Sequence, residues 1–105
     1  AISAGIKMTL DVLFEKTAKL PKIKLAPPKS LIGDTTVDAI RSGILYGYGS
    51  MVDGMIQKFK KELGEKTAVV ATGGYADLIS KYACEIDIID KELTLKGLNY
   101  ICQKN

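Results

Sequence analysis

The sequence lacks histidine altogether and has only two cysteines in 105 residues. The lack of histidine excludes a histidine-based catalytic triad, a histidine general base and histidine metal ligands. Cys84 and Cys102 are far apart and fit no zinc-ligand spacing. They form either a disulfide or two reduced thiols, and we expect reduced, half-buried thiols. Any catalysis must therefore use Asp, Glu, Lys, Thr or backbone groups.

Long apolar runs and clusters of like charge are also absent. No apolar run approaches the roughly 18 residues of a membrane helix, and no signal-peptide pattern is visible. The net charge of +3 comes from scattered lysines, whereas a nucleic-acid interface needs a basic patch or stripe. We therefore expect neither a membrane nor a nucleic acid as partner. The 47% hydrophobic content suffices for the core of one domain.

The first part of the chain predicts short elements. Residues 2–6 resemble the end of a strand that enters a turn, and residues 8–20 carry the apolar spacing of a helix. Pro21 would end this helix. Residues 22–25 alternate in polarity and predict a short edge strand.

The longest predicted element is a helix over residues 33–64. Asp34 or Thr35 is its candidate N-cap, and Gly64 follows a lysine-rich last turn. Because of its place in the apolar stripe, we expect Tyr48 to lie in the core. The stripe consists of Val37, Ile40, Ile44, Tyr48, Met51, Met55 and Phe59.

A second stripe on this helix contains only small residues. Glycine inside a helix costs up to about 1 kcal/mol relative to alanine, so the glycines call for a reason. A stripe without side chains lets another backbone come close. Packing within the domain and self-association both explain it. The stripe comprises Gly43, Gly47, Ser50 and Gly54.

After Gly64 the pattern changes to alternating strands and helices. Residues 67–71 predict a strand buried on both faces, and residues 75–82 a short helix. Residues 86–89 predict a second strand, and residues 93–102 a last helix. This order indicates an α/β layer with parallel strands. Because only three or four short strands are countable, we expect the sheet to be incomplete.

Two polar turns are candidate binding sites. Gly73 and Gly74 follow the predicted strand, where they either form a tight turn or let a ligand approach the backbone. The turn has no lysine, so it is neither a P-loop nor a full dinucleotide fingerprint, and alone it favours the tight turn. Thr35 and Thr36 either cap the long helix or bind a polar group of a substrate.

The carboxylates form no pair positioned for acid–base chemistry. Asp34, Asp38 and Asp53 follow the pattern of a helix surface. Asp87 and Asp90 are expected on the solvent face of the second strand and in the turn after it. We therefore predict no catalytic residue among them.

Four blocks of the sequence closely resemble, in order and spacing, the C-terminal half of type III pantothenate kinases. They read AISAGI…TAKLP, LIGDTTVDAIRSGILYGY, VVATGGYADLI and IDIIDKELTLKGLNYI. Members of this bacterial family use ATP to phosphorylate pantothenate to 4′-phosphopantothenate, the first step of coenzyme A biosynthesis. The resemblance implies a cytoplasmic homodimer and an α/β fold, the ribonuclease H-like half of an actin/sugar-kinase fold.

The resemblance also implies roles for individual residues. Thr36 matches the threonine that contacts pantothenate across the dimer interface, and Gly73 and Gly74 match the glycine pair on the ATP side. Residues 2–5 match a turn near the active site. The helix over residues 35–63 is implied to form the dimer interface, in agreement with its small-residue stripe.

The chain also departs from the family pattern. Ala4 replaces a proline and Asp34 a lysine, and the family's phosphate loop, catalytic aspartate and cation-binding aspartate have no counterpart here. The resemblance implies Mg²⁺ and a monovalent cation, K⁺ or NH₄⁺, bound outside this segment. We therefore expect residues 1–105 to be a C-terminal domain that is inactive alone. The alternative is a non-catalytic regulatory or accessory protein on the same fold.

Overall fold

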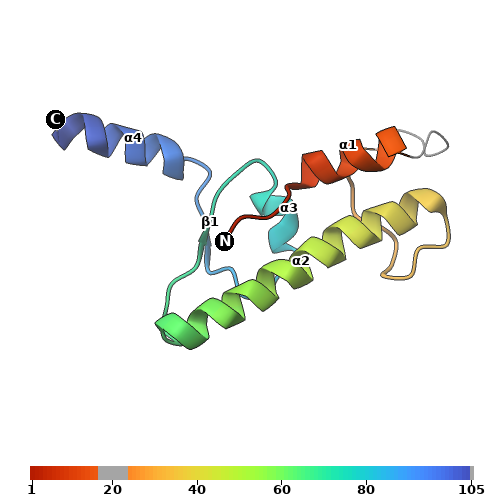
Figure 1. Ribbon diagram of the computed structural model, residues 1–105, viewed down its shortest axis with the longest axis horizontal. Coiled ribbons are helices and arrows are strands. Elements are labelled where there is room, and N and C mark those ends of the chain that lie inside the picture. Colours follow the sequence, from red (N-terminus) through yellow and green to blue (C-terminus); the bar gives the residue numbers. More distant parts are fainter. Residues whose placement is uncertain (17–23, 105) are drawn as a thin grey trace. The chain divides into compact units, whose positions relative to one another are not determined.

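The computed structural model describes residues 1–16 and 24–104. The chain forms two compact units, Ala1–Tyr48 and Gly49–Asn105. The boundary falls inside the long helix α2, Thr36–Leu63, which contributes residues to both units (Figure 1).

The first unit contains the helix α1, Ile6–Lys16, and the first part of α2. The strand expected at residues 2–6 is wrong, because Ala1–Gly5 has no regular structure and α1 begins at Ile6. Of the edge strand expected at residues 22–25, the first two residues lie outside the described residues and the other two are in no strand. Among the described side chains of this unit, the buried apolar ones are Ile6, Leu10, Ile44 and Leu45.

Helix α2 begins and ends as its sequence predicts. The backbone N–H of Asp38 donates to Thr35 Oγ1 at 3.1 Å, so Thr35 is the N-cap. At the other end Gly64 has a φ of 114°, the left-handed conformation that glycine adopts without strain. Lys60 and Lys61 lie in the last turn, where the helix dipole favours cations. Neither α2 nor any other helix in the described ranges is long and apolar enough to cross a membrane.

The second unit has the predicted β-α-β-α order. It consists of β1 (Val70–Ala71), α3 (Ala76–Ser80), β2 (Ile88–Ile89) and α4 (Leu93–Lys104). The two strands are parallel, with Val70 opposite Ile88 and Ala71 opposite Ile89. The described residues thus form a small α/β fold with a two-stranded parallel sheet.

The strand expected at residues 67–71 is shorter and more open than predicted. Only Val70 and Ala71 are in β1, and the side chain of Val70 is 46% exposed. Its neighbour in β2, Ile88, is 56% exposed. The apolar run suggested a strand buried on both faces, whereas these exposed side chains show that the two-stranded sheet is not covered on both faces within the second unit.

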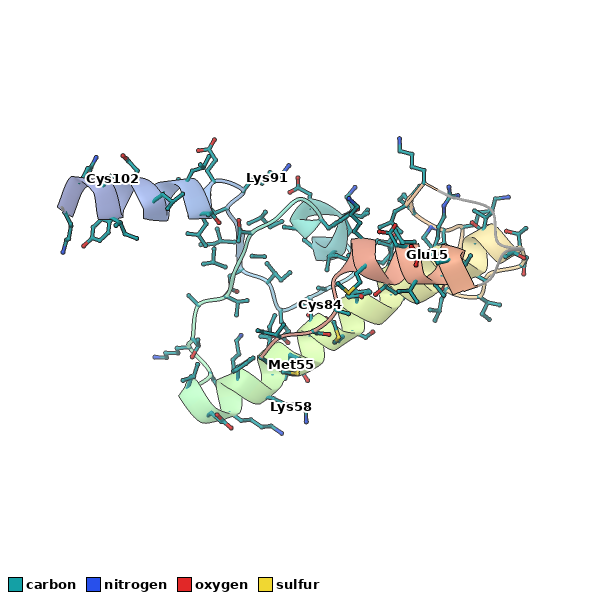
Figure 2. All side chains as sticks on the ribbon, turned by 45° about the horizontal axis from the view of Figure 1, so that its top comes forward. Glu15, Met55, Lys58, Cys84, Lys91 and Cys102 are labelled. Carbon is teal, nitrogen blue, oxygen red and sulfur yellow. The ribbon has the colours of Figure 1, made fainter. Side chains whose placement is uncertain are left out.

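Both cysteines are free thiols, as expected, but neither is half-buried. Cys84 and Cys102 are exposed. Figure 2 shows Cys102 on α4, whereas Cys84 lies beside α2. The expectation of half-burial was wrong for both: Cys102 lies on α4, where every described residue is exposed, and Cys84 is exposed in the segment before β2.

Candidate functional site

A cleft of about 510 Å³ lies between α1 and α2 in the first unit. Its α2 residues recur at three- and four-residue steps, so they lie along one face of the helix. Most of the lining is apolar, with hydroxyl groups from threonine and tyrosine. The cleft is lined by Thr9, Leu13, Thr36, Ala39, Ile40, Gly43, Ile44 and Tyr48.

The two adjacent threonines at the start of α2 have different positions. Thr35 caps the helix, whereas Thr36 is its first residue, is exposed and lines the cleft. Within the described residues, the Thr36 hydroxyl makes no hydrogen bond. The capping alternative therefore applies to Thr35, and the hydroxyl of Thr36 remains available to a ligand.

Contacts at Leu31 and Gly33 help to hold the loop before Thr36 against α2. The hydroxyl of Ser42, a side chain that is only 4% exposed, donates to the carbonyl oxygen of Leu31. Gly33 lies so close to α2 that a Cβ atom there would overlap the backbone of Ala39. Buried polar groups need a partner, and close approach needs glycine. These contacts place the loop against the first turns of the helix that carries Thr36.

Tyr48 is not the core residue that the apolar stripe predicted. It is half-buried, and its hydroxyl lies 2.6 Å from Thr9 Oγ1. The same hydroxyl donates to the carbonyl oxygen of Ala4 at 2.9 Å. The phenol therefore provides the cleft with a hydrogen-bonding group as well as an aromatic face.

The turn containing Gly73 and Gly74 belongs to the second unit and follows β1. Gly73 has a φ of 114°, and its carbonyl accepts a 3.2 Å hydrogen bond from the N–H of Ala76. A side chain would strain the backbone at Gly73, which accounts for that glycine as a turn residue. Both glycines are exposed, with open space around the position of a Cβ. The geometry thus fits a tight turn and leaves its outer side accessible.

A carboxylate on α2 anchors the segment that leads into β2. Asp53 Oδ1 and Oδ2 accept from the N–H of Cys84 at 2.9 and 2.8 Å, and Oδ1 also accepts from the N–H of Glu85 at 2.9 Å. Glu85 in turn forms a 3.4 Å ion pair with Lys60. The helix pattern predicted a surface position for Asp53. The sequence feature that could have indicated this role is an aspartate in the interior of a helix, where aspartate is unfavourable unless its carboxylate has a partner.

The two aspartates around β2 act as the sequence suggested for a strand and its turn. Asp87 Oδ2 accepts from the N–H of Val69 at 2.9 Å, beside the sheet. Asp90 Oδ1 accepts from the N–H of Glu92 at 3.0 Å, at the turn before α4. The hydrogen bond from Lys96 lowers the pKa of the Asp90 carboxyl, and the same bond raises the pKa of Lys96.

The predicted site residues belong to different units. Thr36 lies in the first unit, where the cleft is built by first-unit residues alone, and Gly73 and Gly74 lie in the second. Over residues 1–16 and 24–104, no group of three or more His, Cys, Asp or Glu side chains could hold a metal ion. We assign no step to a metal here.

Comparison with known proteins identifies the family. A family model described as type III pantothenate kinase matches residues 1–58. Curated relatives named type III pantothenate kinase include one from Exiguobacterium sp., 48% identical over 104 residues, which are 99% of this chain and 41% of the relative. Another, from Thermus thermophilus, is 46% identical over 98 residues, which are 93% of this chain and 38% of the relative. A third, from Dehalococcoides mccartyi, is 47% identical over 105 residues, which are 100% of this chain and 41% of the relative.

The chain spans about two fifths of the length of these relatives. The matched region of the family model covers the whole first unit, with α1, the cleft and most of α2. The chain therefore belongs to the type III pantothenate kinase family.

Proposed function

We propose that the complete protein carrying these residues transfers the γ-phosphoryl group of ATP to pantothenate, as the first step of coenzyme A biosynthesis. The observation that carries the proposal is the family match over residues 1–58, which contain the cleft and Thr36. Residues 1–105 would be the C-terminal domain, the ribonuclease H-like half of an actin/sugar-kinase fold, in a cytoplasmic enzyme.

Thr36 is the proposed pantothenate-binding residue. Pantothenate is an acyclic molecule with a dimethyl-substituted carbon, hydroxyl groups, an amide and a carboxylate. The apolar side chains of the cleft suit its carbon skeleton, and the Thr36 hydroxyl supplies a donor and acceptor at the start of α2. Asp34 is exposed two residues earlier and brings a negative charge close to an anionic substrate.

Gly73 and Gly74 are the proposed contacts to ATP. They follow the carboxyl end of β1, the edge at which open parallel sheets bind ligands. Because neither glycine has a side chain, the adenosine can approach the backbone closely. Helix α3 has only five residues, so we assign it no phosphate-binding role.

The groups that carry out phosphoryl transfer are proposed to lie outside this segment. The reaction needs a carboxylate that accepts the proton of the pantothenate hydroxyl, together with positive charge on the phosphates. Mg²⁺ would supply that charge, and a monovalent cation, K⁺ or NH₄⁺, is implied by the family. Residues 1–105 would bind and orient the substrates and would be inactive alone.

The proposed assembly is a homodimer through α2, over residues 35–63. Two observations support this interface. Three glycines of the small-residue stripe have open space where a Cβ would lie, so another backbone could come close. Large apolar side chains also remain exposed along the second half of the helix, namely Met51, Met55, Phe59 and Leu63.

The test replaces Thr36 by alanine in the complete protein and measures ADP release as pantothenate and ATP are varied. Loss of a hydrogen bond to a polar or charged substrate group should raise the KM for pantothenate roughly 10- to 100-fold. The matched control is Thr94→Ala on α4, which should leave the KM unchanged. An unchanged KM in Thr36→Ala would refute the assignment of Thr36.

The same assay distinguishes the kinase from the non-catalytic alternative. The charge of Asp34 beside Thr36 is the observation that favours a regulatory or accessory protein. If the complete, folded protein shows no ATP-dependent turnover of pantothenate, the kinase proposal fails and the alternative is supported.

A further inference from the structure

Two hydroxyl groups and two backbone carbonyls meet at one end of the cleft. Thr9 Oγ1 lies 2.6 Å from the hydroxyl oxygen of Tyr48 and 3.0 Å from the carbonyl oxygen of Gly5. The Tyr48 hydroxyl also lies 2.9 Å from the carbonyl oxygen of Ala4. There are thus three oxygen–oxygen contacts at hydrogen-bond distance, but the two hydroxyl groups have only one proton each to donate.

The positions of the donors decide how these two protons are used. The carbonyl of Gly5 already accepts a 3.0 Å hydrogen bond from the backbone N–H of Thr9. The Thr9 hydroxyl is also within donating distance of the Gly5 carbonyl, but if it donates to Tyr48 instead, Tyr48 can donate to Ala4. In this arrangement both carbonyls have a donor and no two lone pairs face each other at 2.6 Å. Each bond in such a chain polarises and strengthens the next.

This chain, from Thr9 to Tyr48 to Ala4, joins parts of the sequence that are far apart. Ala4 precedes α1 in an exposed segment without regular structure, and Tyr48 lies 44 positions later on α2. Thr9 and Tyr48 also line the cleft that contains Thr36. Because α2 rises about 1.5 Å per residue, the 12 positions from Thr36 to Tyr48 span about 18 Å. The hydroxyl chain therefore lies at the end of the cleft farthest from Thr36 along the helix.

We infer that Tyr48 is a positioning residue of the pantothenate cleft, acting through Thr9 and Ala4. By holding the start of α1 against α2, it fixes the width and the polar end of the cleft. The inference rests on the proposed function, because it takes this cleft as the substrate site. When this end loosens, α1 is no longer held at a fixed distance from α2 and the cleft loses its width, so pantothenate binding weakens, whereas the transfer of the phosphoryl group would be little affected.

The principal test is Tyr48→Phe in the complete protein, which removes one oxygen and keeps the ring. The KM for pantothenate should rise about three- to tenfold, the effect of one lost hydrogen bond. The kcat and the KM for ATP should stay within about twofold, because a raised KM at unchanged kcat means loss of binding that the ground state and the transition state share. Tyr100→Phe on α4, where the side chain is 58% exposed, is the matched control and should change none of them.

Variants of Thr9 test the chain from its other end. Thr9→Val keeps the shape without the hydroxyl and should raise the KM as Tyr48→Phe does. Thr9→Ser restores the donor and should return the KM close to its original value. Because both substitutions break the same chain, the double variant should be little worse than either single variant. These variants decide the question even if Tyr48→Phe folds poorly.

The outcomes separate this inference from the proposed function. Normal turnover of pantothenate with an unchanged KM in both Tyr48→Phe and Thr9→Val would overturn the positioning role alone. Additive effects in the double variant would also overturn it, since they would mean that the two hydroxyls act independently. If the unsubstituted complete protein does not turn over pantothenate, the proposed function fails, and the substrate role of the hydroxyl chain fails with it.

Discussion

At the scale of single residues, the glycines of α2 divide into two kinds. A Cβ at Gly49 would overlap the backbone carbonyl of Tyr82, so this glycine is required by close approach. Gly43, Gly47 and Gly54 have open space at the same position. The sequence spacing singled out the second kind and passed over Gly49, because the approaching segment is 33 positions away and leaves no local signal.

Gly49→Ala should therefore destabilise the protein by about 1 to 3 kcal/mol, the usual cost of overpacking. Chemical denaturation measures the change. The control is Gly97→Ala on α4, where a Cβ meets nothing within 4 Å and alanine favours the helix by up to about 1 kcal/mol. Equal stability of the two variants would contradict the contact with Tyr82.

The polar roles of single residues were predictable only where the partner is local. Thr35 was a candidate cap because its acceptor serves an N–H three residues later. Tyr48 and Asp53 bond to residues 44 and 31 positions away. The apolar periodicity predicted Tyr48 in the core because the pattern takes no account of its hydroxyl group. Asp53 was predicted on the surface because a charged side chain, taken alone, favours solvent.

At the scale of elements, helix α2 was predictable and the strands were not. A helix makes its hydrogen bonds within a few residues, so cap, stripe and terminal glycine specify it locally. In contrast, Val70 pairs with Ile88, which is distant in sequence. An apolar run in the sequence does not indicate how many strands will lie beside it. The sheet was therefore predicted with the right direction and with strands that are too long.

The hydrogen bond between Asp90 and Lys96 at the start of α4 makes stability depend on pH. The hydrogen bond from Lys96 lowers the pKa of Asp90 below its ordinary value of 3.8. A lowered carboxyl pKa contributes stability above the unfolded value, and this contribution is lost as pH falls through the folded pKa. Lys96, whose pKa lies above 10.5, contributes below that value and loses the contribution as pH rises through its folded pKa.

Carboxyl-carbon NMR during an acid titration should show Asp90 titrating below 3.8. In Lys96→Gln, which removes the ammonium, the midpoint of Asp90 should move upward, toward the ordinary range. An Asp90 midpoint that is the same in both proteins would mean that the 2.8 Å bond to Lys96 is not formed in solution.

At the scale of the whole molecule, this chain exposes many large apolar side chains, and it matches only part of the length of its relatives. The chain spans about two fifths of its relatives, and large apolar side chains stay exposed on α2 and α4. On α4 they are Leu93, Leu95, Leu98, Tyr100 and Ile101. Exposed apolar side chains in such number indicate contact surfaces. For α2, the accompanying stripe of small residues is the basis of the proposed homodimer.

Gly47→Leu tests this homodimer in the complete protein. Leucine forms helix better than glycine, and open space surrounds the position in this chain. The substitution should therefore leave each protomer folded, while its side chain prevents another backbone from approaching the stripe. Light scattering should detect a dimer for the unsubstituted protein and a monomer for Gly47→Leu at micromolar concentration. Gly97→Leu, on α4, should remain dimeric. If Gly47→Leu stays dimeric, the copies do not meet along this stripe, and the interface must be sought on the exposed apolar side chains instead.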